Sequence, residues 1–176
     1  MTLSTRSATT GPATVDRAWA AAASVLDPEL PVLTIEDLGV LRDVEVGDDG
    51  GVTVTVTPTY SGCPAMEVIA HDVEAAARAA GFDHVVVRRV LSPAWTTDWL
   101  SDEGRRKLED YGIAPPGSVP GRPGGSAGPV ALALSVRCPQ CGSPDTVETS
   151  RFGSTACKSL WQCRACREPF DHMKAI

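Results

Sequence analysis

The sequence predicts an α+β protein made of two modules: a small α-β-β-α-β-α domain and a shorter, cysteine-rich β module that follows a Pro/Gly linker. Hydrophobic periods typical of helices and of strands alternate through residues 14–111. Five of the six cysteines fall within residues 130–176. The charge also differs between the two modules. The first 111 residues carry 9 basic and 18 acidic side chains, whereas residues 130–176 carry 6 basic and 4 acidic side chains.

The segments outside the two modules have compositions that cannot form a core. Residues 112–129 contain six Gly and five Pro, which is typical of a flexible linker. Residues 1–13 are rich in Ser and Thr and have no apolar core segment of a signal peptide, so we expect a disordered tail.

The first domain is expected to begin with a helix that Thr14 caps and that the Pro-containing segment after Leu26 ends. Its apolar side chains share one face at a period of 3.6: Val15, Ala18, Trp19, Ala22, Val25 and Leu26. Residues 40–46 and 52–58 then alternate with period two around a Gly/Asp turn, which predicts a β-hairpin.

The rest of this domain is expected to contain a helix, a strand and a helix. Residues 64–80 follow a helical pattern that stops at Gly81. A strand is predicted over 85–91, and Ser101 is expected to cap a last helix that ends near residue 111. The strand order stays open.

The second module has two candidate strands, 146–151 and 159–162, each beside a pair of cysteines. A segment of about 45 residues buries too little core to fold alone. We therefore expect a metal ion or a partner to complete it.

Four cysteines of this module have the spacing of metal ligands. Cys138 and Cys141 form one C-x2-C pair, Cys163 and Cys166 form a second, and 21 residues separate the pairs. Two such pairs complete a tetrahedral site of four sulfurs, for which zinc is the first choice and iron, as in a rubredoxin, is the rival. A site with four protein ligands leaves no open position, which favours a structural or recognition role.

Two further residues of this module lie outside the quartet. Cys157 is expected to be a small buried residue, and a reactive or alternative ligand is the less favoured interpretation. His172 is expected at the surface, because four cysteines already complete the metal's shell.

A lone cysteine, Cys63, lies between a predicted strand and a predicted helix. Pro64 suits a first helical turn, so Cys63 is expected beside the helix N-terminus, where free N–H groups and the helix dipole lower a thiol pKa. Two interpretations stay open: a nucleophile or soft-metal ligand, and a small buried residue at a helix start. A Cys-His enzyme is disfavoured, because His71 lies two turns further along the same helix.

Carboxylates gather in two short segments, residues 27–31 (Asp-Pro-Glu-Leu-Pro) and 35–39 (Ile-Glu-Asp-Leu-Gly). They are interpreted either as caps and solvated turns or as groups that line the Cys63 site. Asp27, Glu29 and Asp37 are the candidates of the second interpretation.

Composition excludes several classes of function. An acidic chain of net charge −6 with two Tyr and three Phe is a poor candidate for binding nucleic acid. No apolar run approaches the roughly 20 residues of a membrane span. Motifs of nucleotide-binding loops, zinc proteases, serine hydrolases and di-iron helices are missing from the sequence. We expect a cytoplasmic protein with no nucleic-acid or membrane partner.

These motifs together resemble a known family. Residues 27–31, 35–39 and 59–64 are similar to iron–sulfur assembly domains, the family of the SufT-like maturation factors, over roughly residues 14–111. Residues 153–170, joined to such a domain, look like the D subunits of bacterial phenylacetyl-CoA epoxidase (ring 1,2-epoxidase) systems.

The resemblance implies an accessory factor in phenylacetate catabolism that is not itself catalytic. In such systems an oxygenase with a di-iron centre and a reductase with a [2Fe–2S] cluster and flavin epoxidise phenylacetyl-CoA, and the D subunit assists the maturation of a metal centre. The resemblance also implies that Cys63 is a transfer ligand for transient iron or an iron–sulfur cluster, with Asp27, Glu29 and Asp37 as neighbours.

A lone thiolate would share this cargo with a second protomer, in a homodimer, or with a client oxygenase or reductase subunit. The quartet would then be a zinc ribbon that docks the client. The alternative is an integral non-catalytic or electron-transfer subunit of the same complex. A free-standing enzyme and a nucleic-acid-binding ribbon are the remaining hypotheses.

Overall fold

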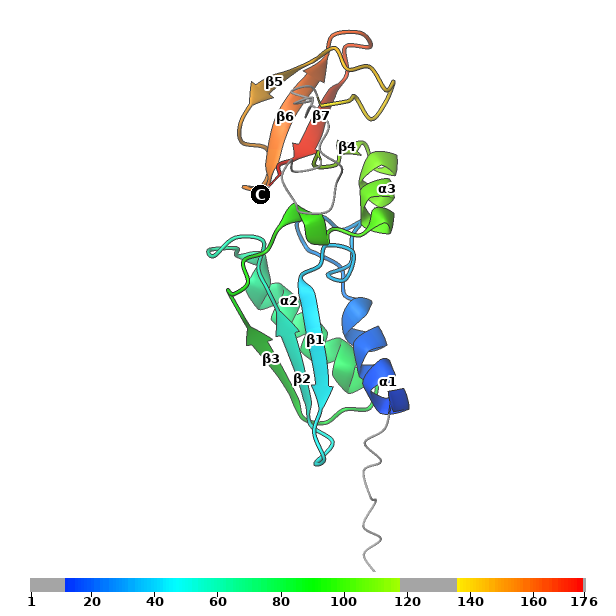
Figure 1. The fold of residues 1–176 in the computed structure, drawn as a ribbon, viewed down its shortest axis with the longest axis vertical. Coiled ribbons are helices and arrows are strands. Elements are labelled where there is room, and N and C mark those ends of the chain that lie inside the picture. Colours follow the sequence, from blue (N-terminus) through cyan, green and yellow to red (C-terminus); the bar gives the residue numbers. More distant parts are fainter. Residues whose placement is uncertain (1–11, 118–135, 176) are drawn as a thin grey trace, which may run out of the picture. The chain divides into compact units, whose positions relative to one another are not determined.

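The computed structural model describes residues 12–117 and 136–175. Most of the expected tail (1–13) and of the expected linker (112–129) therefore lies outside the described residues. The chain divides into two compact units, residues 1–95 and residues 96–176, which Figure 1 colours from blue to green and from green to red.

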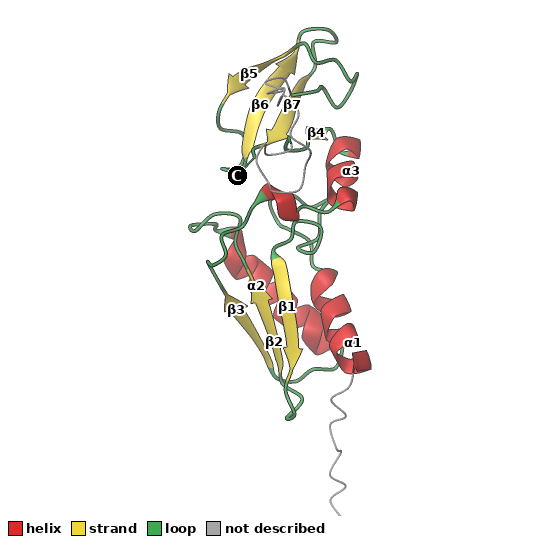
Figure 2. Ribbon diagram, viewed as in Figure 1, coloured by secondary structure: helices red, strands yellow, loops and turns green. Residues whose placement is uncertain are grey.

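The first unit has the α-β-β-α-β order that the sequence predicts. Its elements are α1 (Pro12–Ala23), β1 (Leu41–Val46), β2 (Val52–Val56), α2 (Ala65–Ala79) and β3 (Val85–Arg89). The strands form one sheet in the order β1-β2-β3, antiparallel between β1 and β2 and parallel between β2 and β3. Figure 2 shows α2 crossing one face of this sheet.

The apolar residues of the predicted patterns are buried in this unit, although Thr55 on the other face of β2 is buried as well. Val52, Val54 and Val56 of β2 are buried, as are Met66, Ile69, Val73 and Ala77 on one face of α2. Because β2 and β3 run parallel, the helix between them returns the chain to the starting edge, and the carboxyl ends of both strands meet at one edge. The segment that carries Cys63 leaves β2 at this edge.

The first helix is displaced from its predicted position. It begins at Pro12, before the expected cap Thr14, and ends at Ala23, before the predicted end at Leu26. The backbone beyond Ala23 pairs with the following loop instead, since Ile35 N donates to Val25 O (2.9 Å) and Leu26 forms a β-bridge with Thr34. As a result Leu26 is 51% exposed and does not join the apolar face.

The second unit contains a short helical part and a four-stranded sheet. Its elements are the 3-10 turn η1 (Thr97–Trp99), α3 (Asp102–Asp110), β4 (Ile113–Ala114), β5 (Thr146–Ser150), β6 (Lys158–Cys163) and β7 (Pro169–Met173). The sheet order is β4-β7-β6-β5, with β4 parallel to β7 and the other neighbours antiparallel. Ser101 caps α3 as predicted, since its hydroxyl accepts from Gly104 N (2.9 Å).

The second unit is larger than the module expected at 130–176. Helix α3, expected at the end of the first domain, belongs to this unit. Strand β4 lies within the segment that was expected to be linker, where its two residues are too few to show a period. Strand β7 was also missed, because Pro169 opens a five-residue strand with little alternation.

Candidate functional site

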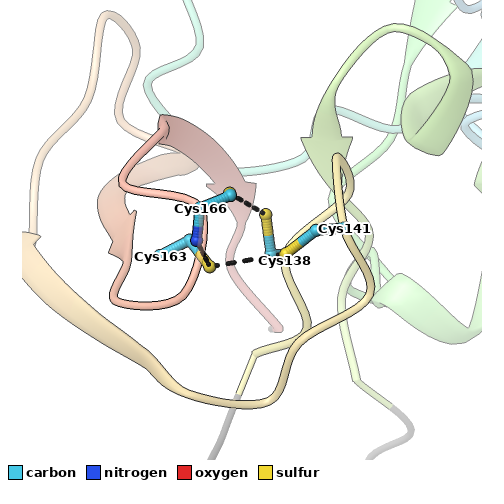
Figure 3. A group of neighbouring side chains, drawn as sticks. All are labelled: Cys138, Cys141, Cys163 and Cys166. Atoms are coloured by element: carbon cyan, nitrogen blue, oxygen red, sulfur yellow. Dashed lines mark hydrogen bonds between the residues drawn. The ribbon is translucent and has the colours of Figure 1, made fainter.

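The four cysteines predicted to be metal ligands lie together in the second unit. Their sulfur atoms are all within 4.8 Å of one another. Cys138 and Cys141 come from the segment before β5, whereas Cys163 is the last residue of β6 and Cys166 lies in the turn between β6 and β7 (Figure 3). The Sγ–Sγ distances are 3.7 Å for Cys138–Cys166 and 3.6 Å for Cys141–Cys163.

These distances fit one tetrahedral metal ion. Four sulfurs about 2.3 Å from a zinc ion are separated from one another by roughly 3.8 Å, whereas a disulfide requires about 2.05 Å. Cys138 and Cys163 are buried in a small core with Ala114 and Phe170. The quartet therefore fits a structural zinc ion, which supplies the core that the short chain lacks.

Each cysteine pair is closed by a tight turn that needs an unusual backbone. Gly142 follows the first pair with φ of +72°, and its N–H donates to Cys138 O (2.8 Å). Arg167 takes the same position after the second pair with φ of +70°. A left-handed conformation costs a non-glycine residue about 1–2 kcal/mol, so the second turn is the more strained one.

Backbone donors favour the thiolate form at one of the four ligands, Cys163. The N–H groups of Cys166 and Ala165 hydrogen-bond to the sulfur of Cys163 and lower its pKa to about 7. Such donors stabilise a thiolate, the form that binds zinc.

Cys157 and His172, the two other residues of this module that the sequence singled out, contact neighbouring side chains of the ribbon. Cys157 is buried as expected, and its sulfur lies 3.1 Å from Thr155 Oγ1. His172 does not belong to the ligand cluster, as expected, but it is half-buried and not fully at the surface. Its Nδ1 is 3.3 Å from Ser159 Oγ, and its ring meets Trp161 edge-on at 5.7 Å. Burial lowers the pKa of His172 to about 4, so it stays neutral at pH 7.

Cys63 lies in the first unit, one residue before the N-cap of α2. Pro64 is that N-cap, with helical φ and ψ of −70° and −21°. The turn is closed by Cys63 N, which donates to Tyr60 O (3.1 Å), and Gly62 has open space around it. The thiol is half-buried, and it takes hydrogen bonds from Ala65 N–H and from the Thr59 side chain.

The loop after α1 brings two of the predicted carboxylates to this thiol. Both Asp27 and Glu29 are close enough for their charges to act on Cys63. Asp27 is 6% exposed, and its Oδ1 accepts from Glu29 N and Leu30 N, both at 2.8 Å, which holds the loop rigid. A negative charge that is buried and fixed in this way can stabilise a cation beside the thiol.

Asp37 has a different position. Its Oδ2 accepts from the backbone N–H and from the hydroxyl of Thr34, both at 3.0 Å. It therefore organises the same loop from within, as the cap interpretation predicted, and its role at Cys63 stays a proposal.

The expected lowering of the Cys63 pKa was wrong. Burial raises the pKa of the Cys63 thiol, and the negative charges of Glu29 and Asp27 raise it further, whereas the Ala65 and Thr59 hydrogen bonds lower it too little to compensate. At neutral pH the thiol therefore keeps its proton. A bound cation would reverse this balance, because it neutralises the carboxylates and displaces the proton.

Alkylation of Cys63 by iodoacetamide is expected to be slow at pH 7 and to rise steadily above pH 9, because only the thiolate reacts. Asp27→Asn combined with Glu29→Gln removes both charges and keeps the hydrogen-bonding oxygens, so the rate at pH 7–8 should increase several-fold to about tenfold. The matched control is Asp72→Asn, an exposed carboxylate of α2. Peptide mapping by mass spectrometry measures the rate at Cys63 alone, and equal rates in all three proteins would contradict the assignment.

Two threonines near this site were missed by the sequence analysis. Thr59 belongs to the segment 59–64 that carries the family resemblance, but its hydrogen bond to the thiol four residues downstream was not predicted. Thr57 is 1% exposed, and its hydroxyl has no hydrogen-bond partner among the described residues. Both follow the end of β2, at the edge where Cys63 lies.

Known proteins match the two parts of the chain separately and together. The family model for the PaaD zinc beta ribbon domain matches residues 123–174, and the model for iron-sulfur cluster assembly protein matches residues 16–87. An Escherichia coli protein, named as the D subunit of a 1,2-phenylacetyl-CoA epoxidase, is 46% identical over 171 residues, which are 97% of this chain and 99% of that protein. The chain belongs to this D-subunit family.

Other proteins match about half of this D-subunit family member. The Fe-S protein maturation auxiliary factor of Porphyromonas gingivalis is 40% identical over 86 residues, covering 48% of this chain and 81% of that protein. The crystal structure of a DUF59 domain from Bacillus anthracis superposes with a TM-score of 0.51 and 28% identity, covering 55% of this chain and 92% of that one. The mixed helix and sheet fold predicted for the first domain is therefore confirmed.

The match to the zinc ribbon also favours zinc over iron in the quartet, as the sequence analysis preferred. Over residues 12–117 and 136–175, none of the helices combines the length and the apolar character that crossing a membrane requires.

Proposed function

We propose that this protein is an accessory factor of a phenylacetyl-CoA epoxidase system and assists the maturation of a metal centre in its oxygenase or reductase subunit. Cys63 is the transfer ligand in this proposal, Asp27 and Glu29 stabilise the cargo, and Asp37 supports them by holding the loop that carries them. The cargo is iron or an iron–sulfur cluster, held as substrate and passed on. The protein itself catalyses no step of the epoxidation.

The observation that carries the proposal is the thiol with two carboxylates at one edge of the first unit. The same unit is the part of the chain that resembles maturation factors of Fe–S proteins. A thiolate with carboxylates is a donor set suited to iron. One protein thiolate leaves most positions of an iron ion open, so a client's ligands can enter while Cys63 is still bound. Such a site suits transfer better than storage.

Charge explains how this site would exchange its cargo. The cation binds as Cys63 loses its proton, and the negative charges of Asp27 and Glu29 favour the bound state. When a client's ligands take over the cation, the thiolate is left beside two carboxylates and takes up a proton again. The raised pKa of the Cys63 thiol therefore favours transfer to the client, because the protonated thiol does not bind the cation again.

The ribbon supports a role with a particular client. The Porphyromonas gingivalis maturation factor covers 48% of this chain, whereas the full-length match is named as the D subunit of an epoxidase. A closed zinc site does no chemistry of its own and stabilises a small surface. We assign this surface to docking of the oxygenase or reductase.

The test is epoxidase activity in cells that depend on this protein. Cys63→Ser should reduce phenylacetyl-CoA epoxidation to the level of cells lacking the protein, because serine does not replace a soft sulfur ligand. The matched control is Cys157→Ser, a cysteine outside both sites, which should leave activity close to normal. Full activity with Cys63→Ser would exclude the transfer role.

An integral, non-catalytic or electron-transfer subunit is the second candidate, favoured by the name of the full-length relative as an epoxidase subunit. The two functions differ in stoichiometry. An integral subunit co-purifies with the oxygenase in a fixed ratio and is required for activity of the finished enzyme in vitro. A maturation factor is dispensable once the client holds its metal.

A further inference from the structure

The turn between β5 and β6 presents an aromatic ring to solvent. Phe152 is 72% exposed, the highest value for a large apolar side chain in the described part of the chain. An aromatic ring left in water in this way is typical of an anchor that a partner buries.

The backbone of this turn is held in one conformation. The Ser150 hydroxyl donates to Phe152 O (2.9 Å) and accepts from Phe152 N (3.2 Å). Gly153 N donates to Lys158 O (2.9 Å), and a Cβ on Gly153 would lie 3.1 Å from Lys158 Cβ, which only glycine avoids. The backbone that carries the ring is therefore positioned before any partner arrives, which lowers the entropy cost of binding.

Positive charge surrounds the ring. The Lys174 ammonium lies 5.1 Å from the centre of the Phe152 ring and donates to Arg151 O (3.3 Å). The nearby Lys158 is neutralised by Asp171 (3.7 Å). Lys174 and the exposed Arg151 therefore give this end of the hairpin a local excess of positive charge.

A second apolar side chain extends the same end of the hairpin. Leu160 is 40% exposed and pairs across the sheet with Ser150, the residue that holds the turn. We name the four residues Arg151, Phe152, Leu160 and Lys174 the Phe152 patch. It combines an aromatic anchor, an aliphatic neighbour and one cation on the β5–β6 hairpin with a second cation, Lys174, that directly follows β7.

We infer that the Phe152 patch docks the ribbon to a component of the epoxidase, at an apolar pocket rimmed by carboxylates. The inference rests on the proposed function, which supplies the client. Charge complementarity sets the acidic rim, and the single fixed ring sets the apolar pocket. Two cations beside a hydrophobic anchor fit such a protein surface better than a phosphate backbone, which requires a longer run of basic residues.

The experiment measures the dissociation constants of the full-length, zinc-loaded protein for the purified oxygenase and for the purified reductase of the same system. Phe152→Ala should weaken binding of the client about tenfold or more, as loss of a central anchor does. Arg151→Glu should slow association and reduce its dependence on salt. Val86→Ala is the matched control, since Val86 is 61% exposed in the other unit, and it should bind like the wild type.

Zinc content and melting temperature of each variant confirm that the ribbon stays folded. Equal affinities for Phe152→Ala and Val86→Ala would overturn the docking surface and leave the proposed function standing. Conversion of a dimer to a monomer by Phe152→Ala, with client affinity unchanged, would overturn it in favour of a second copy as the occupant.

The two proposals also fail separately. The Cys63→Ser variant should bind the client with wild-type affinity. Cys63 lies in the other unit, and its proposed role is cargo transfer and not docking. A wild-type protein that binds neither the oxygenase nor the reductase overturns direct docking, and the activity of Cys63→Ser in cells then decides the proposed function alone.

Discussion

Removal of the metal from the four-cysteine site is expected to unfold the ribbon and to leave the first unit folded. Structural zinc contributes about 10–16 kcal/mol at pH 7 in small zinc modules, far more than the total stability of a short β module. The core around Cys138 and Cys163 contains few other side chains, among them Ala114 and Phe170. The substitution Cys163→Ser should therefore have the same effect as removal of the metal by a chelator, namely unfolding of the ribbon.

Two measurements check this prediction. Metal analysis of the wild type should find one zinc per chain without sulfide, and Cys163→Ser should lose it. Amide NMR signals of β5, β6 and β7 should collapse to the narrow range of an unfolded segment, while those of β1, β2 and β3 stay dispersed. Cys63→Ser is the control and should keep its zinc. Iron without sulfide in the wild type would contradict the zinc assignment.

The carboxylates beside Cys63 are expected to lower the reactivity of the free thiol and to raise the affinity of the site for its metal cargo. Asp27→Asn with Glu29→Gln removes two negative charges next to the bound cation. A charge a few ångströms away at an effective dielectric constant near 20 is worth on the order of a few kcal/mol, so Fe(II) affinity should fall about tenfold to a hundredfold. The same double variant makes the thiol more reactive, because it lowers the pKa.

Anaerobic titration with Fe(II) measures the affinity, and the zinc of the ribbon remains as an internal standard. Asp72→Asn again serves as the control for loss of charge alone, and Cys63→Ser as the limit without a thiol ligand. A double variant that gains thiol reactivity and keeps its Fe(II) affinity would show that the carboxylates tune the cysteine and do not stabilise a metal.

The sequence predicts those features that depend on residues close together in the chain. Both cysteine pairs are local motifs, so their meeting follows from spacing. The Ser101 cap and the alternation of β2 are local as well. The pKa of Cys63 could not be predicted in this way, because it depends on burial of the thiol and on the charges of Glu29 and Asp27, which belong to a loop more than 30 residues away.

The predicted ends of some helices and strands were wrong for a related reason. Helix α1 stops at Ala23 because Val25 and Leu26 pair with Ile35 and Thr34, contacts that a helical period cannot reveal. Strand β4 exists only through its pairing with β7. Composition alone marks this segment as linker, and a tertiary contact overrides that tendency.

The pairing of β4 with β7 also determines where the protein can be divided. A truncation after Gly112 follows the apparent start of the Pro/Gly segment, but it separates α3 from β4 and leaves β7 with an open edge. The boundary between the two compact units lies between Trp95 and Thr96, and the match to iron-sulfur cluster assembly proteins ends before it, at residue 87. A gene fusion or a swap of ribbons between relatives should therefore join the chains at this boundary, so that the ribbon travels with its own helix and edge strand.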